Sequence, residues 1–155
     1  MITMTEQVIG KILVVDDEIE LKDALVEGLL KRSFEAQGYT SGQEALEALR
    51  VETFDLLISD LMMPEMDGIT LIKAARELDP HLVALIMTGQ GTIQTSVDAE
   101  DAGVFDYLLK PFRLQTLMPT LIRAISARRS RNGSATNGDG DDHHPTRQVS
   151  EKLDP

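Results

Sequence analysis

The sequence contains no cysteine, and only 4% of its residues are aromatic. The missing cysteines exclude a secreted disulfide scaffold, and the reducing cytoplasm is the expected location. No apolar run approaches the roughly 18 residues that a membrane helix needs, so we expect no membrane insertion. Positive charge is scarce too, since 15 Lys and Arg against 26 Asp and Glu give a net charge of −11. We therefore expect no direct contact with nucleic acid.

The composition favours one folded domain followed by a polar tail. The chain has 155 residues, of which 42% are hydrophobic, and this suits a single core. The apolar residues of 132–155 are only Ala135, Val149 and Leu153. Such a segment cannot bury enough surface to offset its ordering entropy. We expect an N-terminal extension at 1–9, a domain at 10–131, and a disordered acidic tail or truncated linker at 132–155.

Short apolar runs alternate with helical patterns throughout the predicted domain. Strands are expected at 11–15, 34–39, 56–59, 82–87 and 105–109. The first, third and fourth are nearly continuous apolar runs, which is typical of strands covered on both faces. The alternation predicts an α/β fold with a doubly wound parallel sheet, and the commonest topology is the flavodoxin-like strand order 2-1-3-4-5.

The helical stripes between these strands each predict one buried helix face. They consist of Leu21, Leu25 and Leu29, then Leu46 and Leu49, then Leu71, Ile72, Ala75 and Leu78. The pair Ser41 and Glu44 forms a capping box, and Gly103 is suited to end a fourth helix.

The last helical pattern, at 113–131, contains Pro119. Proline removes a backbone donor, so this helix either kinks or effectively begins near Pro119. Its final turns are basic and suit a solvated helix end or a partner surface; the residues are Arg123, Arg128, Arg129 and Arg131.

Polar residues follow four of the predicted strands. They are Asp16, Asp17 and Glu18 after the first strand, Asp60 after the third, Thr88 after the fourth and Lys110 after the fifth. Ligands of open α/β sheets bind at this carboxyl edge. Each pair of carboxylates about 5 Å apart costs roughly 3 kcal/mol at an effective dielectric of 20, so the three aspartates require a cation. Oxygen-only ligands favour Mg²⁺.

A carboxylate beside Mg²⁺ and an ammonium group is suited to attack a phosphorus centre. The metal and Lys110 neutralise charge on the phosphoryl oxygens, and the carboxylate becomes an acyl phosphate. Thr88 offers its hydroxyl to one phosphoryl oxygen.

Four motifs occur in order along the chain, with sequences ILVVDDE at 12–18, DLMMPEMDG at 60–68, MTG at 87–89 and FDYLLKPF at 105–112. Together they resemble the CheY-like receiver domain of two-component response regulators. The resemblance implies that Asp60 is the phospho-acceptor and that Thr88 and Lys110 contact the phosphoryl group. It also implies a Mg²⁺ site made by Asp17, Asp60, the backbone carbonyl of Met62 and, through water, Asp16.

The resemblance further implies how such a domain would signal. Lys110-Pro111 matches a cis peptide, and Tyr107 matches an aromatic switch residue that responds to Thr88. The loop at 89–91 and the face of the fourth helix, fifth strand and fifth helix would rearrange on phosphorylation. The partners implied are a sensor histidine kinase or a phosphotransfer protein, and possibly a second copy bound through that face. The domain would not be an enzyme beyond its own phosphorylation and dephosphorylation.

Two other classes of protein share parts of this pattern. A flavodoxin-type FMN carrier has the same strand order, but the acidic residues at 16–18 would repel its phosphate. An aspartyl-phosphate phosphohydrolase resembles its relatives in carrying a second Asp two residues after the nucleophile, where this chain has Met62. The sequence leaves open whether the domain stands alone or belongs to a longer regulator or hybrid kinase.

Overall fold

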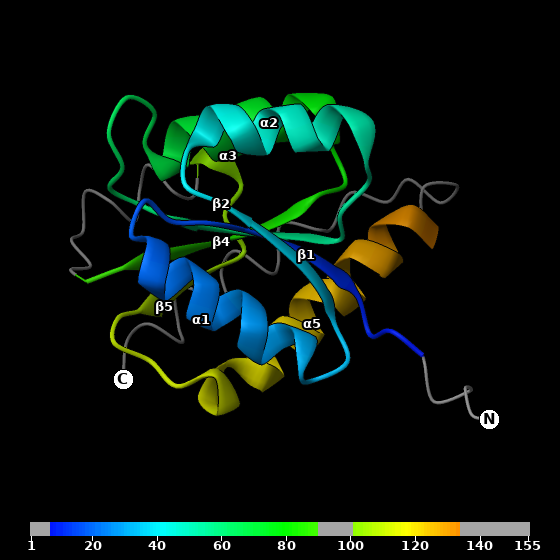
Figure 1. Ribbon diagram of the computed structural model, residues 1–155. Helices are drawn as coiled ribbons and strands as arrows, with labels where there is room; N and C mark the ends of the chain where they lie inside the picture. Colours follow the sequence, from blue (N-terminus) through cyan, green and yellow to red (C-terminus); the bar gives the residue numbers. More distant parts are fainter. Residues whose placement is uncertain (1–6, 90–100, 134–155) are drawn as a thin grey trace.

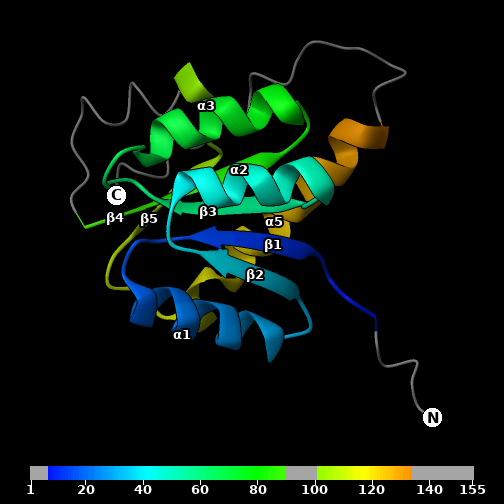
Figure 2. The same ribbon diagram turned by 45° about the horizontal axis from the view of Figure 1, so that its top comes forward.

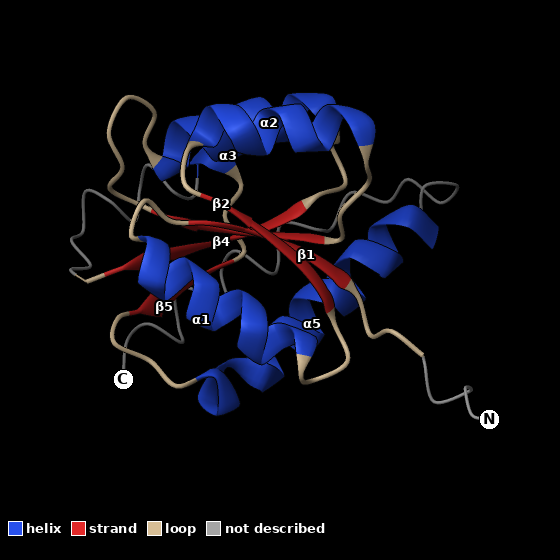
Figure 3. Ribbon diagram, in the orientation of Figure 1, coloured by secondary structure: helices blue, strands red, loops and turns tan. Residues whose placement is uncertain are grey.

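The chain folds around a five-stranded parallel sheet. The structure, a computed structural model, describes residues 7–89 and 101–133. The strands are β1 (Lys11–Val15), β2 (Glu35–Tyr39), β3 (Leu56–Asp60), β4 (Val83–Thr88) and β5 (Asp106–Leu109). Their order in the sheet is β2-β1-β3-β4-β5. Figure 3 shows the strands in red between the helices. The predicted fold class and strand order are therefore confirmed.

Helices cover both faces of the sheet and make three layers (Figures 1 and 2). The first face carries α1 (Ile19–Leu30) and α5 (Leu114–Gly133), and the second carries α2 (Gly42–Val51) and α3 (Gly68–Leu78). Each face has its own apolar core, because side chains of internal strands alternate between the two layers. None of the described helices combines the length and apolar character needed to cross a bilayer.

The helix expected before Gly103 falls mainly on residues 90–100, outside the described part of the chain. Gly103 itself has a φ of 86°. This left-handed conformation is the usual one just after a helix end, and glycine adopts it without a steric penalty.

Burial explains why the apolar runs become strands. All residues of β3 and β4 are buried, whereas the edge strand β2 has only exposed and half-buried residues. Fully burying one Leu, Ile or Val side chain stabilises the fold by roughly 1.5–3 kcal/mol. The parallel register pairs Asp60 with Met87 and Thr88 with Leu109, so the carboxyl ends of β3, β4 and β5 meet at one edge.

Two side-chain caps set the starts of α2 and α3. The Ser41 hydroxyl accepts a hydrogen bond from the Glu44 N–H at 3.2 Å, as the capping box predicts. The Glu44 carboxylate in turn accepts from the Thr40 N–H at 3.4 Å, one residue earlier than that motif implies. At α3, the Asp67 carboxylate accepts from the Thr70 N–H at 2.8 Å.

The predicted helical stripes are correct except at their ends. Leu25 and Leu29 are buried, but Leu21 is 47% exposed and Leu78 is 44% exposed. Leu21 lies in the first turn of α1, where it lines an open groove facing Lys110 and Phe112 rather than the closed core. Leu78 is the last residue of α3, and the last buried residue of that helix is Ala75.

The helix α5 begins at Leu114 and continues through Pro119. The alternative in which it effectively begins near Pro119 is therefore wrong. Pro119 is the sixth residue of this helix, so its missing N–H removes a donor close to the N-terminus, where few intrahelical bonds precede it.

The basic end of α5 is largely used inside the domain, which corrects its interpretation as a solvated helix end. Arg128 is only 6% exposed, and its guanidinium donates to the Asp79 carboxylate at 2.8 Å. The Arg128 Nε also lies 3.8 Å from the Asp55 carboxylate. Arg129 donates to the Ile9 carbonyl at 2.7 Å. These contacts hold the end of α5 against the edge of the sheet opposite the strand ends that carry Asp60 and Lys110.

We predict that Arg128→Ala lowers the free energy of unfolding by about 2–4 kcal/mol, because it leaves two half-buried carboxylates without their cation. The neighbouring Arg129 is exposed, and Arg129→Ala should lower it by less than about 1 kcal/mol. Urea denaturation followed by circular dichroism measures both values. Equal losses in the two variants would contradict the structural role of Arg128.

Candidate functional site

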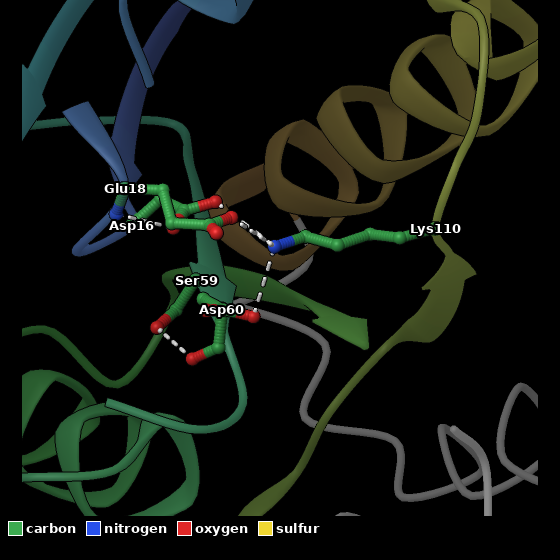
Figure 4. A network of polar contacts seen from close by, with 5 residues as sticks. All are labelled: Asp16, Glu18, Ser59, Asp60 and Lys110. Carbon is green, nitrogen blue, oxygen red and sulfur yellow. Dashed lines mark hydrogen bonds and ion pairs between the residues drawn. The ribbon is translucent and has the colours of Figure 1, made fainter. Parts of the chain in front are cut away.

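The strand ends bring four charged residues to one place. Asp16 and Asp17 follow β1, Asp60 ends β3, and Lys110 follows β5. Because β3 lies between β1 and β4, and β5 lies next to β4, the long Lys110 side chain must reach across the end of β4 to meet the aspartates. Figure 4 shows the extended Lys110 side chain with its ammonium group next to Asp16 and Asp60.

Lys110 is the cation at the centre of this cluster. Its Nζ lies 3.1 Å from an Asp16 oxygen and 3.3 Å from an Asp60 oxygen, and it donates a hydrogen bond to each. The Glu18 carboxylate lies 3.9 Å away on the exposed side. One ammonium group therefore neutralises only part of the carboxylate charge around it (Figure 4).

The three aspartates form a group that is suited to a metal ion. One carboxylate oxygen from each of Asp16, Asp17 and Asp60 lies within 4.8 Å of the others. Asp16 and Asp60 are buried, and Asp17 is exposed. The Asp16 oxygen that does not contact Lys110 accepts from the Glu18 N–H at 2.9 Å, which holds that carboxylate in place. An all-oxygen, partly open donor set of this kind fits Mg²⁺, which keeps several waters when bound to proteins.

The pKa values of the central pair follow from burial and charge. Burial raises the pKa of Asp60, and the Asp16 charge adds to this, while Lys110 acts in the opposite direction without cancelling it. Burial lowers the pKa of Lys110, but the hydrogen bond and charge of Asp16, together with the charge of Asp60, outweigh it and raise the pKa overall. Lys110 is therefore a fixed cation, and the ionised Asp60 carboxylate lacks full compensation.

The other predicted site residues lie around this cluster. Thr88 ends β4 and is 3% exposed, and its carbonyl accepts from the Lys110 N–H at 2.8 Å. Met62 is 72% exposed and lies two residues after Asp60. Tyr107, on β5, is half-buried, and its hydroxyl oxygen is inaccessible to solvent. The predicted cis peptide at Lys110-Pro111 is present.

Of the loop at 89–91, only Gly89 belongs to the described residues. The rearrangement predicted for that loop therefore stays a prediction.

The sequence alone assigned no role to three residues near the acceptor. Glu18 faces Lys110, and the acidic triplet at 16–18 was the available signal for it. Ser59 donates its hydroxyl to the Asp60 carbonyl at 2.9 Å (Figure 4). Gly68 donates its N–H to the Leu61 carbonyl at 2.8 Å. Sequence spacing gives no sign of the last two contacts, because the first depends on the rotamer of Ser59 and the second on how the loop after β3 folds back.

Comparison with known proteins identifies the family. The family model of the response regulator receiver domain matches residues 12–122. The chain belongs to this family. The match favours a receiver over the FMN carrier and the phosphohydrolase, and receivers are the signal-accepting domains of two-component systems.

The relatives include both full-length regulators and single receiver domains. The DNA-binding transcriptional regulator NtrC of Escherichia coli K12 is 38% identical over 117 residues, which cover 76% of this chain and 25% of NtrC. The chemotaxis protein CheY4 of Vibrio cholerae is 31% identical with a TM-score of 0.71, over 74% of this chain and 97% of CheY4.

The beryllofluoride-activated NtrC4 receiver domain dimer is 28% identical with a TM-score of 0.71, over 76% of this chain and 98% of that domain. The chain thus spans about a quarter of the length of its curated relatives and nearly all of the single receivers.

We predict that Asp60→Asn stabilises the fold when divalent ions are removed with EDTA. The substitution removes a buried charge next to Asp16, and the free energy of unfolding at pH 7 should rise by about 1–2 kcal/mol. Since the pKa of Asp60 is raised in the folded state, the penalty is present above that pKa. It disappears as the pH falls below the unfolded value of about 3.9, so the difference between variant and wild type should shrink there.

Urea denaturation at several pH values measures this difference. The matched control is Asp101→Asn, which changes an exposed aspartate and should leave the free energy of unfolding within about 0.5 kcal/mol. A loss of stability in Asp60→Asn would show that Lys110 fully compensates both buried carboxylates.

Proposed function

We propose that this receiver accepts a phosphoryl group on Asp60 in a Mg²⁺-dependent reaction. The donor is the phosphohistidine of a sensor histidine kinase or phosphotransfer protein, or a small phosphodonor such as acetyl phosphate. One observation carries the proposal: a buried Asp60 carboxylate lies 3.3 Å from the Lys110 ammonium and within 4.8 Å of two further carboxylates. Such an arrangement serves phosphoryl transfer better than stability.

The reaction follows from the positions of these groups. An Asp60 oxygen attacks phosphorus in line, while the bond from phosphorus to the donor nitrogen breaks and leaves its electron pair on the imidazole. Lys110 neutralises charge on the transferred oxygens, and the Thr88 hydroxyl donates a hydrogen bond to one of them. The raised pKa of Asp60 makes its ionised form a stronger nucleophile, since basicity and nucleophilicity rise together.

The metal site of this proposal uses the acidic cluster. Asp17, Asp60 and the Met62 carbonyl would hold Mg²⁺ directly, and Asp16 would act through water. A bound Mg²⁺ ion supplies positive charge for the phosphoryl oxygens and lowers the repulsion among the carboxylates. Dephosphorylation is a property of the same site, and the domain turns over no other substrate.

Phosphorylation would be reported through β5 and the elements beside it. The Thr88 carbonyl is hydrogen-bonded to the Lys110 N–H, so a shift at the end of β4 is passed to the end of β5. Tyr107 lies on β5 and serves as the switch residue, while the face of β5, α5 and the helix before Gly103 is the output surface. Leu109 and Ile122 are exposed there and offer apolar contacts to a second copy. The dimer of the beryllofluoride-activated NtrC4 receiver domain supports this proposal.

The proposed domain organisation is a receiver at 10–131 between an extension at 1–9 and a tail or linker at 132–155. Residues 1–6 and 134–155 lie outside the described part of the chain. The relatives include longer DNA-binding regulators, so the receiver either stands alone or serves a longer regulator or hybrid kinase. Because the 155-residue chain has a net charge of −11, we expect that another domain makes any contact with DNA. The proposed location is the cytoplasm.

We predict that Asp60→Asn abolishes labelling by acetyl phosphate, because the amide is no nucleophile for phosphorus. Phosphate-affinity gels or intact-protein mass spectrometry, with an expected gain of one phosphoryl group in wild type, measure the outcome. Asp101→Asn is the control and should be labelled at the wild-type rate. Labelling of Asp60→Asn at that rate would place the acceptor elsewhere.

We also predict that Mg²⁺ stabilises the wild-type fold. At a concentration 100 times the dissociation constant, the gain is about 2.7 kcal/mol. The gain should be smaller in Asp17→Ala, because one ligand is missing, and unchanged in Asp23→Ala, which removes another exposed aspartate near the start of α1. Thermal melts with Mg²⁺ and with EDTA measure the difference. Equal gains in wild type and Asp17→Ala would remove Asp17 from the metal site.

A further inference from the structure

The peptide that follows the acceptor is held between two elements. The Leu61 N–H donates to the Met87 carbonyl of β4 at 2.8 Å, and the Leu61 carbonyl accepts from the Gly68 N–H of α3 at 2.8 Å. The Asp60 carbonyl accepts from the Ser59 hydroxyl at 2.9 Å. The first turn of α3 therefore packs directly on the backbone that carries the acceptor side chain.

Gly68 makes this packing possible, since a larger residue has no room there. A Cβ atom at Gly68 would lie 2.4 Å from the Asp60 carbonyl oxygen and 3.1 Å from the Leu61 Cα. Both atoms belong to the backbone and cannot rotate away as a side chain can. Relief of the overlap requires a shift of either the Asp60 backbone or the start of α3.

We propose that Gly68 is a positioning residue for phosphoryl transfer, because its missing side chain lets the first turn of α3 bind the Leu61 carbonyl without displacing the Asp60 backbone, which keeps the acceptor carboxylate within reach of Lys110. This inference rests on the proposed role of Asp60. It assigns to Gly68 an effect on the rate of reaction in addition to its effect on stability.

Gly42 provides a matched control. It is also the first residue of a capped helix and is also buried. A Cβ atom at Gly42 would meet the Met66 Sδ at 2.6 Å, which is the far end of a flexible side chain. Gly42→Ala and Gly68→Ala therefore make the same chemical change at the same helix position. Only at Gly68 does the added Cβ meet backbone atoms.

The test compares rates of labelling by acetyl phosphate at saturating Mg²⁺, at a temperature where circular dichroism shows each variant folded. Gly68→Ala should be slower than wild type by about tenfold to a hundredfold, because a misplacement of about 1 Å has effects of this size. Isothermal titration should also show weaker Mg²⁺ binding in Gly68→Ala, since the displaced backbone carries Asp60. Gly42→Ala should stay within about twofold of wild type in both measurements.

Two further variants separate positioning from simple loss of stability. Asp67→Ala removes the cap of α3 without placing an atom against Asp60, so it should lose stability and keep the wild-type rate when folded. The Ile86 Cδ1 is the other close neighbour of a Cβ at Gly68, at 3.0 Å. Adding Ile86→Val to Gly68→Ala relieves that contact only and should not restore the rate.

The outcomes distinguish this inference from the proposed function. Wild-type protein that is not labelled at all overturns the role of Asp60. Labelled wild type with an equally fast Gly68→Ala, or rescue by Ile86→Val, overturns only the positioning role. If Gly68→Ala does not fold in buffer, the rates of all variants are compared in a stabilising osmolyte such as trimethylamine N-oxide, and a Gly68→Ala rate equal to wild type there overturns the inference.

Discussion

Two buried carboxylates share one ammonium group at the carboxyl edge of this sheet, and much of the molecule serves to keep them there. Asp16 is 1% exposed and Asp60 is 8% exposed, yet Lys110 supplies a single positive charge to both. Ionised groups are not gathered in this way for stability, because their desolvation is compensated only in part. This excess negative charge is what the proposed Mg²⁺ ion would offset.

At the opposite edge of the sheet, the buried positive and negative charges are balanced. There Arg128 is buried beside Asp79 and Asp55, and Arg76 also interacts with the Asp79 charge, so two cations face two half-buried acids. Neighbouring arginines bind backbone carbonyls of the domain. Ion pairs thus stabilise the edge at Arg128, whereas Asp16 and Asp60 still repel each other at the other edge. Proteins typically depart from full charge compensation where they function, and this contrast supports the proposed phosphoryl-transfer site at the aspartate edge.

Local patterns predicted much of this molecule correctly, and the exceptions have a common cause. Continuous apolar runs identified β1, β3 and β4, and the Ser41 cap marked the start of α2. The same patterns placed Leu21 in the core and Arg128 in solvent, and both are wrong. Periodicity reports which face of a helix is apolar. It does not report how far a neighbouring element extends over that face.

The sequence by itself determined the order of the elements, the acidic and basic residues at the strand ends and the family to which they belong, because these depend on residues close together along the chain. Only the tertiary structure decided that Lys110 reaches both Asp16 and Asp60, and that the first turn of α3 at Gly68 packs on the Asp60 backbone. Such contacts join segments distant in sequence, and their distances depend on the twist and register of a folded sheet.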